Sequence, residues 1–325
     1  MTLEGSLPGP AILRYSFGMA HGTPHTGDTS CRICGSGNTV LWKPRDLSRE
    51  LRPEDFSITD SRYGLTLTLY RCADCSFIFA SESEIGELVE LYEQLEDPGY
   101  EEGAESRQLQ MRDLLRLGMA AQPKARNLLD IGAGSGLLVA EAGRQGLAAV
   151  GVEPSKSLVA TATQNNRGEL IQGTFPHPRL QGRQFDLVYL VDVIEHVSDP
   201  VRLLADCAHA LAPGGVLLVV TPDVSSFAKL LLGQRWWHFR LAHVGYFNSR
   251  SMNKAAGLAG LAIQSTTRVR WFFPIRYLAE RAAKYVPLAW LNRAAVRVAP
   301  LRRLYSVVVP INLRDSSAFI MTRKG

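Results

Sequence analysis

The sequence predicts an α/β protein whose main unit is a doubly wound, mostly parallel β-sheet. Three observations lead to this prediction. From Asn127 onward, short apolar segments alternate with segments of helical periodicity. The apolar segments lack the polar alternation of a half-exposed strand, which is typical of strands covered on both faces. A glycine-rich turn follows the first apolar segment, as it does in Rossmann-like sheets.

The alternating segments give the order of the expected elements. Pro213, Gly214 and Gly215 end one helix and turn the chain into the next strand. After an aromatic loop at 236–247 we expect a helix near 250–259, a strand near 261–270 and a final strand at 318–322. The earlier elements are strands at 127–131, 148–153, 168–172, 185–191 and 215–221, and helices at 136–146, 155–165 and 199–211.

Smaller pieces precede this domain, because 325 residues exceed the usual size of one domain. Residues 1–28 are rich in Gly, Pro, Ser and Thr without periodicity and predict a disordered tail. Residues 29–80 predict a small zinc-ribbon-like module, and 81–124 a helical linker or lid. The main domain then covers 125–325, with a basic helical insertion at about 273–303.

Composition narrows the classes of protein that remain. The net charge of +5 and the pI of about 9.0 are a modest basic excess that does not by itself require nucleic acid. No apolar run is long enough to span a membrane, and the N-terminus lacks the pattern of a signal peptide. We therefore expect a cytoplasmic protein, in which Cys207 is a small core residue.

The segment from Asn127 to Gly136 reads N-L-L-D-I-G-A-G-S-G. Its three alternate glycines let the backbone turn sharply and approach a ligand that a Cβ atom would push away. A second apolar run ends at Glu153, about 20 residues further on, where a carboxylate can accept hydrogen bonds from both hydroxyls of a ribose. The pattern predicts a nucleotide-type cofactor site.

The spacing distinguishes this site from a dinucleotide site. A dinucleotide fingerprint is G-x-G-x-x-G, whereas this loop is G-x-G-x-G, with Leu137 where the last glycine would stand. Asp130 adds a negative charge before the loop, which suits a cationic ligand better than a diphosphate. From about Asn127 to Leu261 the chain resembles the class I S-adenosylmethionine-dependent methyltransferases, whose first motif is D-I-G-x-G-x-G and whose second strand ends in an acid.

The resemblance implies how S-adenosylmethionine would be held. The loop would pass beneath the methionine part, Glu153 would hold the ribose, and Pro154 with the Gly173-Thr174 turn would flank the adenine. Family members often carry an acid near Thr174 for the adenine amino group, and this chain has none there. The implied cofactor-binding residues are Asp130, Gly132, Ala133, Gly134, Gly136, Glu153, Pro154, Gly173, Thr174, Asp192 and Val193.

The block from Phe185 to Pro200 resembles the family's fourth strand and the segment after it, F-D-x-V and then E-H-V-x-D-P. In the ubiquinone methyltransferases, an acid, a second acid three residues on and the adjacent histidine lie near the substrate and can hold a divalent ion such as Mg²⁺. Here these residues are Asp192, Glu195 and His196. Three interpretations of His196 stay open: a general base, a metal ligand with the two acids, or a hydrogen-bonded structural residue.

The aromatic loop after the fifth strand resembles the variable acceptor side of the family. Methyl transfer needs mainly alignment of the acceptor and removal of a proton, so the sequence does not single out one base. His243 in this loop is a second candidate for that base. For Trp236 and Trp237, packing of a lid is an equally good interpretation.

Two C-x-x-C pairs, Cys31 with Cys34 and Cys72 with Cys75, predict a structural zinc site. Two such turns supply four thiolates in a closed tetrahedron, and disulfides are not expected in a reducing compartment. Some RNA methyltransferases carry a zinc module, but residues 31–80 hold similar numbers of acids and bases and no basic stripe with aromatics. RNA is therefore the lesser alternative. Similar four-cysteine heads precede the catalytic domain of bacterial sugar and glycan-cluster methyltransferases.

The insertion at 273–303 carries seven basic residues and one acid among aromatic and aliphatic residues. This composition fits two interpretations: a helical cap over the substrate pocket with a solvated basic rim, or a segment that contacts the surface of the inner membrane.

These features together predict a methyltransferase that uses S-adenosylmethionine and structural zinc, with Mg²⁺ as a further option. The expected acceptor is a small molecule, a sugar or a lipid-linked precursor, methylated on oxygen before carbon. The alternatives are an RNA methyltransferase and a zinc-stabilised binding module without catalysis.

Overall fold

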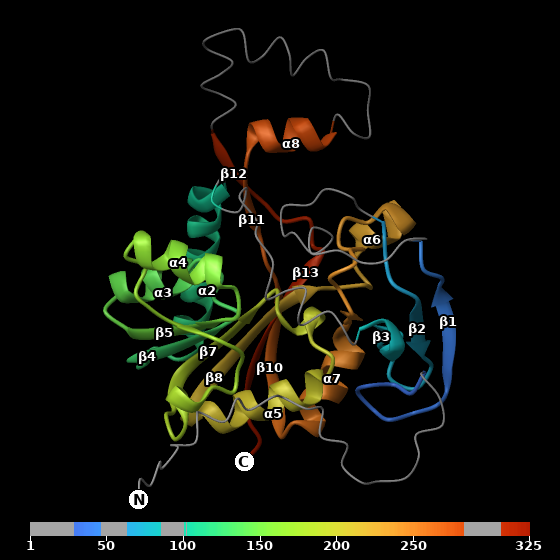
Figure 1. The fold of residues 1–325 in the computed structure, drawn as a ribbon, viewed down its shortest axis with the longest axis horizontal. Helices are drawn as coiled ribbons and strands as arrows, with labels where there is room; N and C mark the ends of the chain where they lie inside the picture. The colour runs from blue at the N-terminus through green and yellow to red at the C-terminus, as the bar shows by residue number, and fades with distance from the viewer. Residues whose placement is uncertain (1–28, 47–63, 86–100, 102, 283–306) are drawn as a thin grey trace, which may run out of the picture.

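The computed structural model describes residues 29–46, 64–85, 101, 103–282 and 307–325 (Figure 1). The predicted tail at 1–28, the middle of the linker and most of the basic insertion lie outside the described residues. No helix in the described ranges is long and apolar enough to cross a membrane.

A seven-stranded sheet forms the centre of the molecule, in the order β10-β13-β8-β7-β4-β5-β6. The pairs from β8 to β6 are parallel, whereas β13 and β10 add antiparallel strands at one edge. The prediction of a doubly wound, mostly parallel sheet is confirmed. The strands are β4 (Asn127–Ile131), β5 (Ala148–Glu153), β6 (Glu169–Gln172), β7 (Phe185–Val191), β8 (Leu211–Pro222), β10 (Leu261–Arg268) and β13 (Ser316–Arg323).

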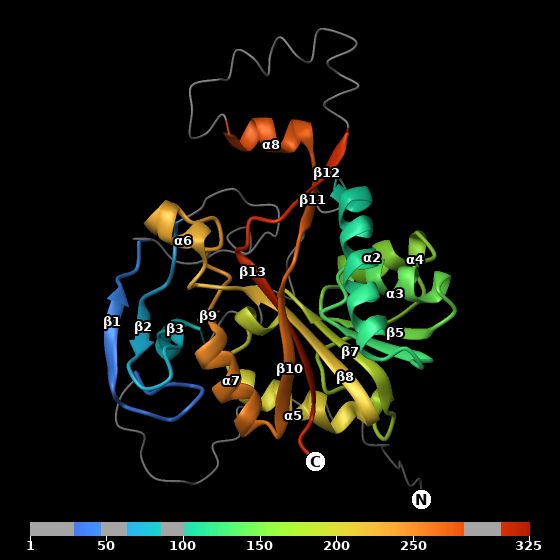
Figure 2. The ribbon, with the colours of Figure 1, turned by 180° about the vertical axis from the view of Figure 1, so that it is seen from behind.

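Helices cover both faces of the sheet (Figure 2). Successive strand residues point to opposite faces, so Leu128 belongs to a core with α2 and α3, and Leu129 to a core with α5 and α7. Cys207 on α5 is fully buried, as expected of a core residue. The helices are α2 (Ala104–Ala121), α3 (Leu137–Arg144), α4 (Lys156–Gln164), α5 (Pro200–Ala210), α6 (Phe227–Leu232), α7 (Ser249–Leu258) and α8 (Ile275–Ala282).

The N-terminal module is built into the main domain. Its strands β1 (Thr39–Lys43), β2 (Leu69–Cys72) and β3 (Ile78–Ala80) form a sheet that β9 (Gly245–Tyr246) completes from the main domain. Two core clusters mix residues of the module and of the main domain. The predicted boundary at residue 80 therefore separates two parts of the sequence that share one packed core.

Two segments differ from the expected elements. The chain enters β8 at Leu211, and the turn around Gly214 lies inside this strand, because Leu211 pairs with Phe185 ahead of the regular ladder. At the other end, Phe273 and Pro274 belong to β11 (Trp271–Pro274), which pairs with β12 (Val308–Ile311). The predicted helical insertion thus begins as a strand, and helix α8 follows it.

Candidate active site

The glycine loop lies at the carboxyl end of β4. Gly132, Gly134 and Gly136 have φ angles of 72°, 54° and 79°, in the left-handed region that favours glycine. A Cβ atom on Gly132 would lie 2.5 Å from a methyl group of Val193, so the close approach of the loop to the β7 side also requires glycine. Gly136 is the N-cap of α3.

Glu153, at the end of β5, holds this loop. One carboxylate oxygen accepts a hydrogen bond from the Gly134 N–H at 2.8 Å, and the other accepts one from the Ser155 N–H at 2.9 Å. The side chain is buried, which raises its pKa, and these two hydrogen bonds oppose that rise. Glu153 therefore fixes the loop in addition to the ribose contact that the sequence predicts.

Asp130 lies behind the loop and is also buried. Burial, and then the charge of Glu153, raise its pKa to about 7. Gly173 continues the same edge, because its N–H donates to the Glu153 carbonyl at 3.0 Å. The predicted cofactor residues thus follow the carboxyl ends of β4 to β7, where ligands bind in sheets of this kind.

Asp192 follows β7 with a φ angle of 53°, a left-handed conformation that costs energy outside glycine. Its backbone N–H donates to Val220 at 3.0 Å. Asp192 is exposed to solvent. Partial loss of hydration, and then the Asp315 carboxylate, raise its pKa above the ordinary value.

Glu195, His196 and His243 meet beyond the ends of β7 and β8. One potential metal-ligating atom of each lies within 4.8 Å of the others. Glu195 and His196 belong to the short helix η5 (Ile194–His196), whereas His243 comes from the loop before β9. The closest set therefore contains His243 in place of Asp192, the third member of the trio that the sequence predicts.

The polar atoms of this cluster are unevenly satisfied. One oxygen of Glu195 accepts a hydrogen bond from the Thr221 hydroxyl at 3.0 Å. The other oxygen, and Nδ1 of His243, are buried and have no hydrogen-bond partner among the described residues. Unpaired buried polar atoms are costly, so a ligand, an ion or a shared proton would stabilise the cluster.

Both histidines of the cluster are neutral at pH 7. Burial lowers the pKa of His196 to about 4, although the hydrogen bond of its Nδ1 with the Ala242 carbonyl, at 2.8 Å, opposes this effect. With Nδ1 as donor, Nε2 is left with the lone pair. Burial, and then the neighbouring histidines, lower the pKa of His243 well below its ordinary value.

A second polar group, formed by Asp315, Trp237 and His238, was not predicted from the sequence. Asp315 precedes β13 and is 1% exposed, and its carboxylate lies 3.0 Å from Nε2 of His238 and 2.8 Å from Nε1 of Trp237. His238 belongs to the aromatic loop at 236–247, which the sequence analysis placed on the acceptor side. Asp315 stands alone in the sequence, about 77 residues away, and no local pattern marks it.

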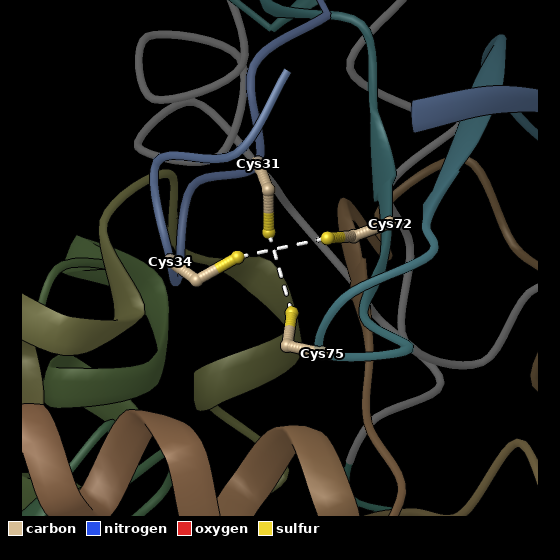
Figure 3. A group of neighbouring side chains, drawn as sticks. All are labelled: Cys31, Cys34, Cys72 and Cys75. Atoms are coloured by element: carbon tan, nitrogen blue, oxygen red, sulfur yellow. Dashed lines mark hydrogen bonds between the residues drawn. The ribbon is translucent and has the colours of Figure 1, made fainter. Parts of the chain in front are cut away.

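The four cysteines converge as the sequence predicts (Figure 3). The sulfurs of Cys31 and Cys75 are 3.5 Å apart, and those of Cys34 and Cys72 are 3.6 Å apart. Zinc bonded to four sulfurs at about 2.3 Å would separate them by roughly 3.8 Å, so the cluster fits a tetrahedral zinc ion. None of the four is in a disulfide, and three of them are buried.

The fold and this site define the class of protein: a Rossmann-like domain with a glycine loop and an acid at the ends of its first two parallel strands. The family model described as methyltransferase domain matches residues 104–266, half of the chain. The chain belongs to this family, which confirms the prediction from the glycine motif.

Curated relatives match a similar region. A ubiquinone biosynthesis O-methyltransferase of Bradyrhizobium is 36% identical over 127 residues, 36% of this chain and 44% of that protein. Another, from Parvibaculum lavamentivorans, is 29% identical over 155 residues, 44% of this chain and 61% of that protein. The chain thus spans about half the length of the curated relatives it matches.

Solved structures include an S-adenosylmethionine-dependent methyltransferase of Archaeoglobus fulgidus, with a TM-score of 0.46 and 14% identity over 70% of this chain and all of that one. A second, from Clostridium acetobutylicum, has a TM-score of 0.45 and 12% identity over 67% of this chain and 92% of that one.

Proposed function

We propose that this protein transfers a methyl group from S-adenosylmethionine to an oxygen atom of a small-molecule acceptor. The observation that carries the proposal is the placement of two groups of residues at one edge of the sheet. The glycine loop held by Glu153 lies beyond β4 and β5, and the cluster around His196 lies beyond β7 and β8. Membership of the methyltransferase family supports the same activity.

Bound S-adenosylmethionine supplies a methyl group already activated by its sulfonium charge. The chain's part is to hold and align. The backbone of Gly132 to Gly136 receives the amino-acid part at close range, and Glu153 keeps lone pairs for the ribose hydroxyls. Asp130 adds negative potential beside the loop in its ionised form, which favours a cationic ligand.

His196 is our first candidate for the general base. Its Nδ1 is engaged by the Ala242 carbonyl, so Nε2 can accept a proton from an acceptor hydroxyl. The ring is partly exposed, whereas His243 is 6% exposed and Glu195 is 1% exposed. We therefore propose that the more deeply buried His243 and Glu195 position His196 and the acceptor. His243 remains the second candidate for the base.

A divalent ion at this cluster is the second candidate mechanism, favoured by the unpaired atoms of Glu195 and His243. Two imidazoles and one carboxylate suit zinc or another transition metal better than Mg²⁺, which prefers oxygen ligands. Bound there, the ion would acidify the acceptor hydroxyl. Asp192 would then contribute charge from outside the closest set.

We propose structural zinc for the four cysteines, since their spacing fits a closed tetrahedron. The acceptor is a small or lipid-linked molecule, in line with the names of the curated relatives. Exposed Arg276 and Tyr277 on α8 suit either a cap over the acceptor or peripheral contact with a membrane by a cytoplasmic protein.

The test is methyl transfer from labelled S-adenosylmethionine into fractionated cell extract. We expect label in a small or organic-soluble fraction, and far less of it when His196→Ala replaces the wild type. Label that is lost on ribonuclease treatment would support the RNA alternative instead. A wild-type protein that binds no S-adenosylhomocysteine would leave the non-catalytic binding module as the better account.

A further inference from the structure

The side chain of Arg32 links the N-terminal module to both chain segments that carry the histidine cluster, and the Ala80 N–H adds a backbone hydrogen bond to one of them at 2.9 Å. Arg32 lies inside the first cysteine knuckle, between Cys31 and Cys34. Its guanidinium donates to the Ser198 carbonyl at 3.1 Å and, by a short hydrogen bond, to the Val244 carbonyl. The two carbonyls are far apart in the sequence, but one guanidinium bonds to both.

Both carbonyls belong to segments that carry cluster residues. Ser198 stands two residues after His196, and Val244 directly follows His243. The Val244 N–H donates to the Glu195 carbonyl at 2.8 Å, so the two segments are also joined to each other. Arg32 therefore holds a pair of loops whose relative position sets the distance between the two imidazoles.

The guanidinium is well suited to this role. Arginine stays protonated at neutral pH and presents several N–H donors in a rigid plane, so it can hold two carbonyls in a fixed relation. It also lies over the Phe79 ring, 5.7 Å from the ring centre, in the strand that pairs with β9. The guanidinium thus contacts the module through Phe79 and the two loops through their carbonyls.

We infer that Arg32 is a positioning residue of the methyl-transfer site: through it, the four-cysteine module fixes the geometry of His196 and His243. The inference rests on the proposed function for its kinetic consequence only. The placement of the two rings can be tested without any acceptor.

A matched control exists in the same interface. Arg250, on α7, donates to the Asp74 carbonyl at 2.6 Å, beside the second cysteine knuckle. It is the same kind of link between the module and the main domain, but it lies on the surface and contacts neither histidine segment. His209, an exposed histidine of α5 whose Nδ1 pairs with the Ala205 carbonyl, serves as an internal reference.

The experiment records the imidazole nitrogen and proton signals of the full chain by NMR, with each signal assigned by a histidine-to-glutamine variant. We expect Arg32→Gln to shift the signals of His196 and His243 and to leave His209 unchanged. Arg250→Gln should leave all three unchanged. Unmoved His196 and His243 signals in folded Arg32→Gln, or equal shifts in both variants, would overturn the inference.

Turnover is measured on the same samples. We expect Arg32→Gln to lose about 10- to 100-fold in kcat, as small misplacements of catalytic groups do, with binding of S-adenosylhomocysteine within twofold of the wild type. If Arg32→Gln does not fold, Arg32→Lys decides, since it keeps the charge but not the planar fork. Shifted histidine signals in Arg32→Lys would support the inference, and wild-type signals would contradict it. A wild type without methyl transfer would refute the proposed function. The NMR shifts would then still decide whether Arg32 positions His196 and His243.

Discussion

The two halves of the proposed site are assembled in different ways. The cofactor half is local: the glycine loop and Glu153 come from consecutive strands, β4 and β5, and bond directly to each other. The acceptor half is not local, because it gathers Arg32, His196, His243 and Asp315 from four distant segments. A site of this kind can keep its cofactor chemistry while the acceptor half changes with the pieces that surround it.

The largest effect is expected in the acceptor half. His196→Ala should lower turnover by roughly 10²- to 10⁴-fold, because the proton acceptor or metal ligand is lost, while binding of S-adenosylhomocysteine stays within twofold. His209→Ala, an exposed change on α5, is the control.

Chelators separate the two mechanisms of this half. Loss of turnover in a chelator that leaves the proposed zinc of the four cysteines in place, restored by added divalent ions, would assign His196 to a metal site. Turnover that resists chelators but falls as the pH approaches the pKa of about 4 would assign it as the base. Full activity of His196→Ala would contradict both roles.

In the cofactor half, Glu153→Gln should weaken binding of S-adenosylhomocysteine by roughly 10- to 100-fold. Charge-assisted hydrogen bonds contribute about 1.5 to 3 kcal/mol each, and the ribose contact and the loop contact are both weakened. Calorimetry is the measurement. Glu169→Gln, an exposed acid on β6, should bind as the wild type does, and equal affinity in Glu153→Gln would remove that residue from the site.

The pKa of His196 predicts a dependence of stability on pH. Its folded value of about 4 lies below the ordinary value of 6.5, so the unfolded chain takes up the proton first as the pH falls. The resulting stabilisation of the unfolded state grows from about pH 6.5 down to about 4 and reaches roughly 3 kcal/mol. Urea unfolding of wild type and His196→Gln should diverge over that range, and parallel curves would show that folding does not lower the pKa of His196.

The smallest predicted effect concerns the glycine loop. Gly132→Ala should lower the stability of the fold by about 1 to 2 kcal/mol, because the backbone at this position is left-handed. It should also weaken binding of the cofactor, because the new Cβ would lie 2.5 Å from Val193. Gly146→Ala has a similar φ, 81°, but open space around it. We expect it to lose stability alone, so equal cofactor affinity in the two variants would contradict the close approach.

The sequence predicted where the residues of the proposed cofactor half lie in the fold, because their determinants are local. A strand, a glycine turn and an acid at a fixed distance each leave a pattern in consecutive residues, and so do the two C-x-x-C knuckles. The glycine turn and the acid lie side by side because the carboxyl ends of neighbouring parallel strands meet at one edge of the sheet.

The acceptor half was predicted only in part. His196 and His243 stood out as motif residues, but the contact of their rings joins segments far apart in the chain, which no local pattern reports. Asp315 and Arg32 were missed for the same reason. An isolated acid before an edge strand and an arginine between two cysteines acquire a role only through contacts far along the chain.

The account's central claim is that one edge of the sheet holds two separable halves, one for the cofactor and one for the acceptor. The most direct test measures the affinity for S-adenosylhomocysteine and the kcat of methyl transfer on the same preparations of wild type, Glu153→Gln and His196→Gln. We expect affinity to fall in Glu153→Gln alone, and kcat at saturating cofactor to fall mainly in His196→Gln. Loss of cofactor affinity in His196→Gln equal to that in Glu153→Gln, with both proteins folded, would contradict the claim.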